Sequence, residues 1–300
     1  IALYKNFITP LFIIKFTIFT PTYNRAYTLP ALYQSLRNQT CMDFEWVIVD
    51  DGSTDNTETV CQGFKQDLFP ISYFRQQNSG KHVAVNEGVK QAQGEWFFIV
   101  DSDDHLPVDA IEKLQIEERT IHSEKIGVLC GMRHYFNGKR ICSNFPYDKI
   151  DCTALDFRYK YRAKGDVAEV VRTKVMKEFP FPQYPGERFC PEAILFNRIA
   201  QKYLTHYFNA CIYLCKYLPD GLSAHIVKVR MQSWRSTCLC YAEMGKAPIP
   251  FDAKLRAWIN YWRFSACRSK KESPLQITIP FFAKILRPLG LLFHLKDCRS

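Results

Sequence analysis

The sequence predicts an α/β fold with a mostly parallel central sheet flanked by helices and a helical C-terminal extension. In the first half of the chain, short apolar runs rich in β-formers alternate with segments of helical periodicity, which is typical of a parallel sheet with helical crossovers. After about residue 220 this alternation gives way to long helical patterns. We therefore expect an N-terminal extension over residues 1–14, an α/β domain over 15–220 and a helical, basic region over 221–300.

The first half is expected to open with a strand over Phe16–Thr20, followed by a loop and a helix from about Leu29 to Gln39. A second strand, Phe44–Val49, leads into a helix whose start is marked by capping residues at positions 53–55. The next expected elements are a strand over 71–75, a helix from 78 to about 91, a strand over 95–100 and a helix from 107 to about 122.

The second half is expected to begin with a hairpin that turns at Asn137-Gly138, between strands over 127–135 and 140–144. A strand over Val167–Val175 follows, and a proline-rich loop then leads to a helix from Pro191 to about Lys202. The helices expected beyond Asp220 cover about 222–244, 251–267 and 280–296.

Composition argues against a disordered chain, a disulfide-rich protein and a zinc protein. With 47% hydrophobic and 23% charged residues, the 300-residue chain has enough apolar sequence for a sizeable core. The twelve cysteines are scattered and form no Cys-x-x-Cys pair, which indicates buried thiols in a reducing compartment rather than disulfides or a zinc site. The apolar leader Ile8–Ile14 is too short to cross a bilayer and lacks the small-residue cleavage site of a signal peptide.

Positive charge is concentrated at the C-terminus. Residues 251–300 carry ten Lys or Arg residues against three acids, so +7 of the formal net charge of +10 lies there. Aromatic and aliphatic residues are interleaved with these cations, a composition that suits a segment lying on an anionic membrane surface. Packing of amphipathic helices on the preceding domain is the equally weighted alternative. Nucleic acid is not expected as a partner, because no binding motif accompanies the charge.

Two acidic clusters follow two of the expected strands. Asp50 and Asp51 close the second strand, while Asp101, Asp103 and Asp104 close the fourth. Ligands of open α/β sheets bind outside the carboxyl ends of the strands. Crowded carboxylates raise one another's pKa unless a cation joins them. The second cluster therefore predicts a hard divalent ion, Mg2+ or Mn2+.

Four motifs carry a family resemblance: Phe-Thr-Pro-Thr-Tyr-Asn-Arg at 19–25, Val-Asp-Asp-Gly-Ser-Thr-Asp at 49–55, Asn-Ser-Gly-Lys with Asn-Glu-Gly at 78–88, and Asp-Ser-Asp-Asp at 101–104. In order and spacing they resemble those of the family 2 inverting glycosyltransferases, which have the GT-A, Rossmann-like fold. The resemblance implies binding of a nucleoside-diphosphate sugar. A UDP-sugar is the preferred donor in this reading.

The resemblance also implies roles for the first acidic cluster and its neighbours. Pro21 and Tyr23 would belong to the pocket for the nucleobase, and Asp51 would accept a hydrogen bond from that base. Asp50 would hold the loop. Lys81, at the start of a helix, would contact phosphate, since a cation and free backbone N–H groups both favour an anion there.

The second cluster would serve the ribose and the metal. The resemblance places Asp101 at the ribose, Ser102 in the donor site, and Asp103 on the Mg2+ or Mn2+ that bridges the diphosphate. Asp104 would support the loop. Val85 stands where many relatives have an arginine, so the phosphate contacts of that arginine would fall to Lys81 or His82.

An inverting transfer needs a base within reach of the acceptor hydroxyl. The family usually supplies a carboxylate after the hairpin region, often as a Glu-Asp pair, and this chain has Glu187 and Glu192 there. Glu192 is favoured because Pro191 begins a helix and would fix the glutamate in its first turn. Glu187 is the reserve candidate.

The expected activity is metal-assisted transfer of a sugar to an acceptor hydroxyl of a glycan or lipid-linked molecule, in cell-surface glycan or polysaccharide synthesis. We expect a cytoplasmic protein, at the inner face of the membrane if the tail binds lipid. A sugar-1-phosphate nucleotidyltransferase is an alternative, although the loop after the first strand lacks the glycines expected of such an enzyme. A nucleotide-sugar-binding protein without catalysis is another.

Overall fold

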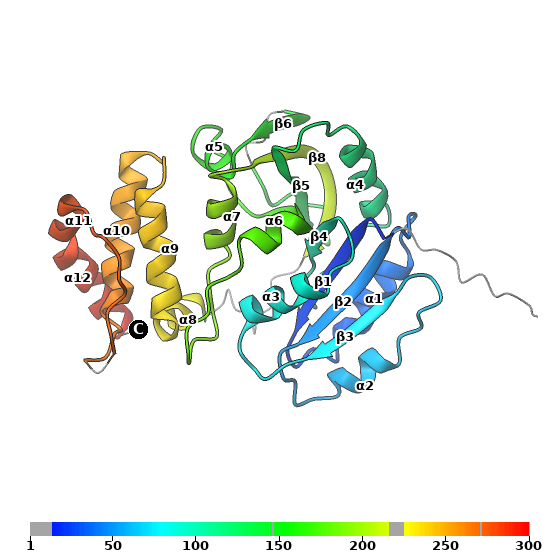
Figure 1. The fold of residues 1–300 in the computed structure, drawn as a ribbon, viewed down its shortest axis with the longest axis horizontal. Helices are drawn as coiled ribbons and strands as arrows, with labels where there is room; N and C mark the ends of the chain where they lie inside the picture. The colour runs from blue at the N-terminus through cyan, green and yellow to red at the C-terminus, as the bar shows by residue number, and fades with distance from the viewer. Residues whose placement is uncertain (1–13, 144, 146, 216–224, 271, 300) are drawn as a thin grey trace, which may run out of the picture.

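An eight-stranded sheet forms the centre of the molecule (Figure 1). The computed structural model describes residues 14–143, 145, 147–215, 225–270 and 272–299. The strand order is β3-β2-β1-β4-β7-β5-β8-β6. The strands are β1 (Phe16–Thr22), β2 (Phe44–Asp50), β3 (Ile71–Arg75), β4 (Trp96–Ile99), β5 (Ile126–Tyr135), β6 (Lys149–Cys152), β7 (Val167–Arg172) and β8 (Leu204–Cys215).

Four strands of the first half, β1 to β4, run parallel to one another. β7 is antiparallel to both β4 and β5, while β5 and β8 are parallel and β6 closes the edge as an antiparallel strand. The predicted α/β class with a mostly parallel sheet is thus confirmed. All seven residues of β1 and all seven of β2 are buried, because helices cover both faces of a parallel sheet.

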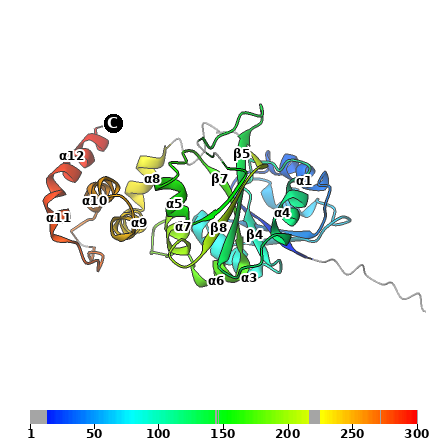
Figure 2. The same ribbon diagram turned by 90° about the horizontal axis from the view of Figure 1, so that it is seen from above.

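Helices cover the two faces of the sheet and continue into a C-terminal helical region (Figures 1 and 2). On one face, α1 and α4 pack against the sheet, and on the other α3, α6 and α7 do so. The helices are α1 (Leu29–Arg37), α2 (Thr57–Gln62), α3 (Lys81–Gln91), α4 (Ala110–Arg119), α5 (Ala154–Tyr159), α6 (Thr173–Glu178), α7 (Ala193–Ile199), α8 (Ile226–Gln232), α9 (Trp234–Lys246), α10 (Phe251–Ser265), α11 (Phe281–Ile285) and α12 (Arg287–Asp297).

The C-terminal helices share a core of their own, built around Trp234, Trp258 and Phe264. Helices α9 and α10 pack closely at Gly245, where a Cβ would lie 2.5 Å from the indole nitrogen of Trp258. The region is attached to the α/β domain through α9, where Arg198 of α7 pairs with Glu243 at 2.7 Å. Among the described residues, no helix combines the length and the apolarity needed to cross a membrane.

Several sequence-based boundaries were wrong. The strand expected over 167–175 ends at Arg172, the last residue paired with β4, and residues 173–178 turn into α6, whose Val175 and Met176 join the core under the sheet. Residues 140–143 form no strand, and residue 144 lies outside the described residues; the turn at Asn137-Gly138 is present, but only single bridges follow it in the described part of this segment.

The C-terminal helices also differ from expectation. The helix expected over 222–244 is two helices that meet at Ser233, and its first residues lie outside the described part of the chain. The helix expected over 280–296 divides at Leu286, just before Pro288 takes its place in the first turn of α12. Elements that the sequence analysis missed are β6, α5 and the twelve-residue strand β8.

Candidate active site

The two acidic clusters lie at the same edge of the sheet. β1 is paired in parallel with β2 on one side, with Thr22 opposite Asp50, and with β4 on the other, with Phe19 opposite Ile99. The carboxyl ends of the three strands therefore meet at this edge, where the loop that carries Asp101 begins. This is the position in which open α/β sheets bind ligands.

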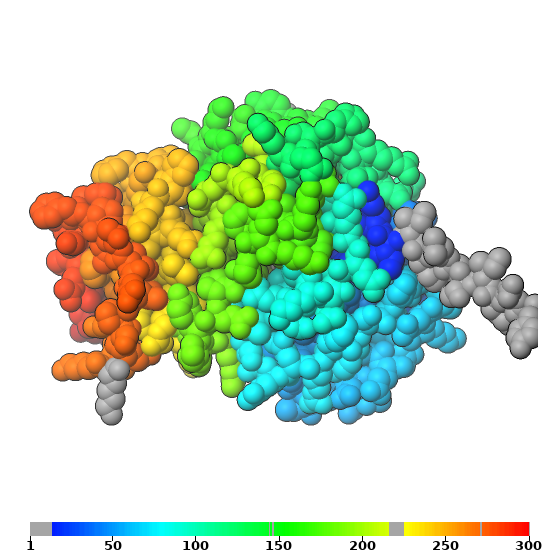
Figure 3. Space-filling model, viewed as in Figure 1, coloured from blue at the N-terminus to red at the C-terminus, as the bar shows by residue number. Residues whose placement is uncertain are grey.

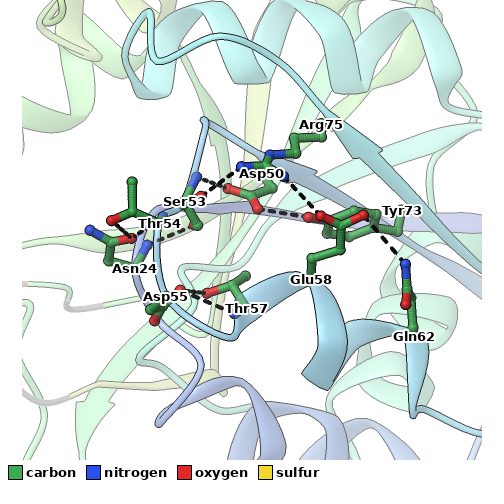
Figure 4. A network of polar contacts seen from close by, with 10 residues as sticks. All are labelled: Asn24, Asp50, Ser53, Thr54, Asp55, Thr57, Glu58, Gln62, Tyr73 and Arg75. Carbon is green, nitrogen blue, oxygen red and sulfur yellow. Dashed lines mark hydrogen bonds and ion pairs between the residues drawn. The ribbon is translucent and has the colours of Figure 1, made fainter.

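A polar network fixes the first acidic loop (Figure 4). The carboxylate of Asp50 accepts hydrogen bonds from the backbone N–H of Ser53 at 2.8 Å and from the hydroxyl of Tyr73 at 2.7 Å. Asn24, in the loop after β1, donates its backbone N–H to the Ser53 hydroxyl and accepts from the N–H of Thr54, both at 2.8 Å. The network joins the loops after β1 and β2.

Asp51 links this loop to the start of α3. Its buried carboxylate accepts hydrogen bonds from the side-chain amide of Gln76 (2.8 Å) and from the backbone N–H groups of Ser79 and Gly80 (2.7 Å each). Gly80 has φ of +98°, and a Cβ there would lie 2.0 Å from the carbonyl oxygen of Arg188. Only glycine fits this turn, which places the next residue, Lys81, over the sheet edge.

Lys81 connects the second acidic cluster to the candidate base. Its ammonium nitrogen lies 2.6 Å from Asp101 Oδ1 and 2.7 Å from Glu192 Oε1. Burial lowers the pKa of Lys81, but the charges of Asp101 and Glu192 more than offset this, so its pKa is raised. For Asp101, burial raises the pKa, but the positive charge of Lys81 lowers it by more than burial raises it, so the pKa of Asp101 is lowered. Lys81 is therefore a cation and Asp101 an anion at neutral pH.

His82 cannot share the role of Lys81 as a cation. The residue is 2% exposed, and neither ring nitrogen has a hydrogen-bond partner among the described residues. Burial lowers the pKa of His82 to about 4. The imidazole is therefore neutral at physiological pH, and of the two residues considered for phosphate contact only Lys81 brings a positive charge.

The remaining acids of the second cluster have different surroundings. Burial and the neighbouring charge of Asp101 raise the pKa of Asp103, whose carboxylate accepts no hydrogen bond from another described residue. The same two causes raise the pKa of Asp104 to about 7. Asp104 is buried and accepts a hydrogen bond from the hydroxyl of Tyr213 at 2.7 Å. Ser102 is also buried.

Asp103 fits a hard divalent cation. No group of three His, Cys, Asp or Glu side chains that could form a closed protein cage is found in the described part of the chain. Mg2+ and similar ions are, however, commonly held by one or two carboxylates together with substrate phosphates and water. A carboxylate that is crowded by a second acid and has no hydrogen-bond donor from another described residue suits that arrangement, and Asp103 is such a group.

The two candidate bases lie in different places. Glu192 precedes the first residue of α7, and its side chain is 46% exposed beside Lys81. Glu187 is buried, and its carboxylate accepts hydrogen bonds from the backbone N–H groups of Arg235 (2.6 Å) and Ser236 (2.9 Å) and from the Ser236 hydroxyl (2.7 Å). Glu187 therefore holds the first turn of α9, while Glu192 faces the acidic edge through Lys81.

A family model matches the part of the chain that carries these loops. The model for Glycosyl transferase family 2 covers residues 17–145. The chain carries a family 2 glycosyltransferase domain. Tyr23, 46% exposed, and Pro21, buried at the end of β1, lie within that domain, as do both acidic clusters.

Curated relatives match about a third of this chain. The GalNAc(5)-diNAcBac-PP-undecaprenol beta-1,3-glucosyltransferase of Campylobacter jejuni is 36% identical over 102 residues, 33% of this chain and 33% of that protein. A PGL/p-HBAD biosynthesis glycosyltransferase of Mycobacterium bovis is 41% identical over 92 residues, 30% of this chain and 36% of that protein. The matched region thus spans about a third of each relative.

Solved structures show the GT-A fold. TarS 1–349 of S. aureus, in complex with UDP, matches with a TM-score of 0.65 at 21% identity, covering 94% of this chain and 88% of that one. The mannosyltransferase PcManGT of Pyrobaculum calidifontis, in complex with GDP-Man and Mn2+, matches with a TM-score of 0.53 at 16% identity, covering 95% and 75%. The expected GT-A fold of the domain is confirmed.

Tyr213 is a further site residue, which sequence reasoning missed because β8 itself was missed. The fully buried hydroxyl accepts a hydrogen bond from the backbone N–H of Asp101 (3.0 Å) and donates one to Asp104 Oδ2 (2.7 Å). The guanidinium of Arg133 lies 4.3 Å from the ring centroid. An aromatic residue 112 positions away from Asp101 thus holds the loop between Asp101 and Asp104 at both ends.

We expect Tyr213→Phe to lower the free energy of unfolding by about 1–3 kcal/mol, since it takes a hydrogen-bond partner from two groups on the second acidic loop. If Tyr213 positions the loop for ligands, the affinity for donor measured by calorimetry with metal present should also fall several-fold. Tyr207→Phe is the matched control, because Tyr207 is a buried tyrosine of the same strand whose hydroxyl bonds to no other described residue. If the folded Tyr213 variant binds donor as tightly as the wild type, the Tyr213 hydroxyl contributes to stability and not to donor binding.

Proposed function

We propose that this chain transfers one sugar from a nucleoside-diphosphate donor to an acceptor hydroxyl, with inversion and with the help of a divalent cation. The observation that carries the proposal is the position of Lys81, which joins Asp101 of the second acidic cluster to Glu192. Donor-side acids, a partly buried cation and a candidate base thus form one connected group at the carboxyl edge of a family 2 domain. The family match favours glycosyl transfer over nucleotidyl transfer.

The donor would lie across the two acidic loops. Tyr23 and Pro21 would border the base, with Asp51 beside it, while Asp50 keeps the loop in place through Ser53 and Tyr73. Asp101 and Ser102 would meet the ribose. This placement is supported by TarS, whose solved complexes contain UDP and UDP-GlcNAc, and we therefore prefer a UDP-sugar.

Asp103 would hold the Mg2+ or Mn2+, and the bound ion supplies charge neutralisation for the departing nucleoside diphosphate. Lys81 would add a fixed positive charge on the diphosphate side. Glu192 would accept the proton of the acceptor hydroxyl as its oxygen bonds to the anomeric carbon. The bond from that carbon to the diphosphate oxygen breaks, the electron pair leaves with the diphosphate, and attack from the opposite side inverts the anomeric centre.

The acceptor we propose is a glycan carried on a lipid, with the protein working at the cytoplasmic face of a membrane in glycan or polysaccharide synthesis. The support comes from the C. jejuni relative, whose name describes a pyrophosphate-undecaprenol-linked glycan as its acceptor. A hydroxyl at the end of such a glycan needs only an open approach to Glu192, and that side chain is 46% exposed.

A panel of nucleotide sugars tests the proposal. A ligand that binds only the folded state stabilises it by about 2.7 kcal/mol at a hundred times its dissociation constant. We expect one UDP-sugar to raise the melting temperature with Mn2+ or Mg2+ present and to lose this effect with a chelator. Absence of any metal-dependent shift across UDP-, GDP- and ADP-sugars would contradict the donor site. Binding without release of nucleoside diphosphate, over a panel of acceptors, would favour a non-catalytic binding protein.

A further inference from the structure

Helix α12 is apolar on two sides, and only one of them packs against the protein. The inner side faces α10: a Cβ on Gly290 would lie 2.4 Å from the Cβ of Trp262, and the carboxylate of Asp297 pairs with the guanidinium of Arg263 at 2.5 Å. Leu292 and Leu295 lie on the opposite side of the helix from Gly290, given 100° per residue. A surface helix normally presents polar residues there.

The outer side of α11 and α12 instead carries several exposed apolar side chains, which together we call the outer face. Phe281 is 79% exposed, Ile285 67% and Leu292 63%. Its members are Phe281, Ile285, Leu289, Leu291, Leu292 and Leu295. Six large exposed apolar side chains within fifteen residues form a patch of the kind that marks an interaction site. The two helices lie at the end of the molecule farthest from the sheet (Figures 1 and 2), and the space-filling view shows this end projecting beyond the α/β domain (Figure 3).

Positive charges accompany the outer face. The exposed cations of this segment are Lys284, Arg287, Lys296 and Arg299. None of them forms an ion pair with a described residue, although the Arg287 guanidinium also lies over the ring of Trp262. Asp297, the one acid within 281–299, is engaged by Arg263. The electrostatic field around the outer face is therefore positive.

We infer that the outer face of α11 and α12 binds the interface of an anionic lipid membrane, with both helices lying in the plane of the surface. Helices with exposed leucine and phenylalanine on one side and lysine or arginine at its margins bind such interfaces through apolar burial and attraction to anionic head groups. Association with a second copy fits less well, because the cores of protein interfaces are depleted in lysine and two such faces would bring like charges together. The inference is independent of the proposed function, since binding needs neither donor nor acceptor.

Co-sedimentation of the full chain with vesicles tests this inference. We expect binding to vesicles of equimolar phosphatidylcholine and phosphatidylglycerol, and much weaker binding to phosphatidylcholine alone. Leu292→Asn with Leu295→Asn should weaken partitioning by at least about tenfold, from the lost apolar burial. Lys284→Gln with Lys296→Gln should weaken it roughly 25-fold at low salt, at about fivefold for each charge.

Ile116→Asn is the matched control, because Ile116 of α4 is a 52% exposed aliphatic residue outside the outer face. Melting temperatures of all variants establish that each is folded, and light scattering reports the oligomeric state. The inference is overturned if the wild type does not sediment with anionic vesicles, or if the asparagine and glutamine variants sediment as the wild type does. A wild-type dimer that the leucine substitutions dissociate, without vesicle binding, would assign the face to a second copy.

Discussion

Asp103→Ala is expected to lower the turnover number by at least about a thousandfold, because a bound cation contributes several kcal/mol to the departure of the diphosphate and each 1.36 kcal/mol is a factor of ten in rate. Asp103 is the acid of the second cluster that no other described residue engages by a hydrogen bond. Metal-dependent release of nucleoside diphosphate is the measurement. Asp109→Ala is the control, since Asp109 is a half-exposed carboxylate of the following segment, paired with Lys113 at 2.8 Å.

The same variant should be at least as stable as the wild type without metal. The pKa of Asp103 is raised in the folded state. As the pH rises, this carboxyl group therefore loses its proton earlier in the unfolded chain than in the folded protein, and ionisation favours unfolding. The ionised carboxylate therefore destabilises the fold at pH 7, and its removal relieves this cost. Urea denaturation at pH 7 with a chelator measures the effect. Full metal-dependent activity of the folded Asp103 variant would refute the proposed metal site.

The fold of the first half could be predicted because its signals are local. β2 is an apolar run interrupted by Glu45 that ends in acids, and Leu29, Leu32 and Leu36 of α1 recur on one helical face and are fully buried. By contrast, β8 contains His206 and Asn209 among its apolar residues and pairs with β5, about eighty residues earlier in the chain. No local pattern reports that pairing, so the longest described strand was missed.

In the candidate site too, local features could be predicted from the sequence and contacts between distant segments could not. The acids at the ends of β2 and β4 could be recognised from sequence, because their position after a strand is itself the signal. Their partners could not: Lys81 meets Glu192 across more than a hundred residues, and the Tyr213 hydroxyl reaches Asp104 from β8. The local pattern around Glu187 and Glu192 likewise held no information about α9, whose first turn engages the Glu187 carboxylate.

Glu192→Gln is expected to lower the turnover number with little effect on stability, whereas Glu187→Gln is expected to lower stability with little effect on the turnover number. At Glu192 the amide cannot take the proton of the acceptor hydroxyl, so the turnover number should fall about 10²- to 10⁴-fold. Donor affinity and stability should stay close to those of the wild type, because Lys81 keeps its contact with Asp101. The measurements are steady-state kinetics, donor titration by calorimetry and urea denaturation of each variant.

At Glu187 the glutamine would direct an N–H group at backbone N–H groups of α9, in a buried position that now holds a carboxylate with three donors. Loss of charge-assisted hydrogen bonds of this kind costs about 1.5–3 kcal/mol each. The free energy of unfolding should therefore fall by at least about 2 kcal/mol, while the folded fraction keeps its turnover number within a few-fold. A Glu187 variant that is fully stable yet inactive, beside a fully active Glu192 variant, would reverse the assignment of the base.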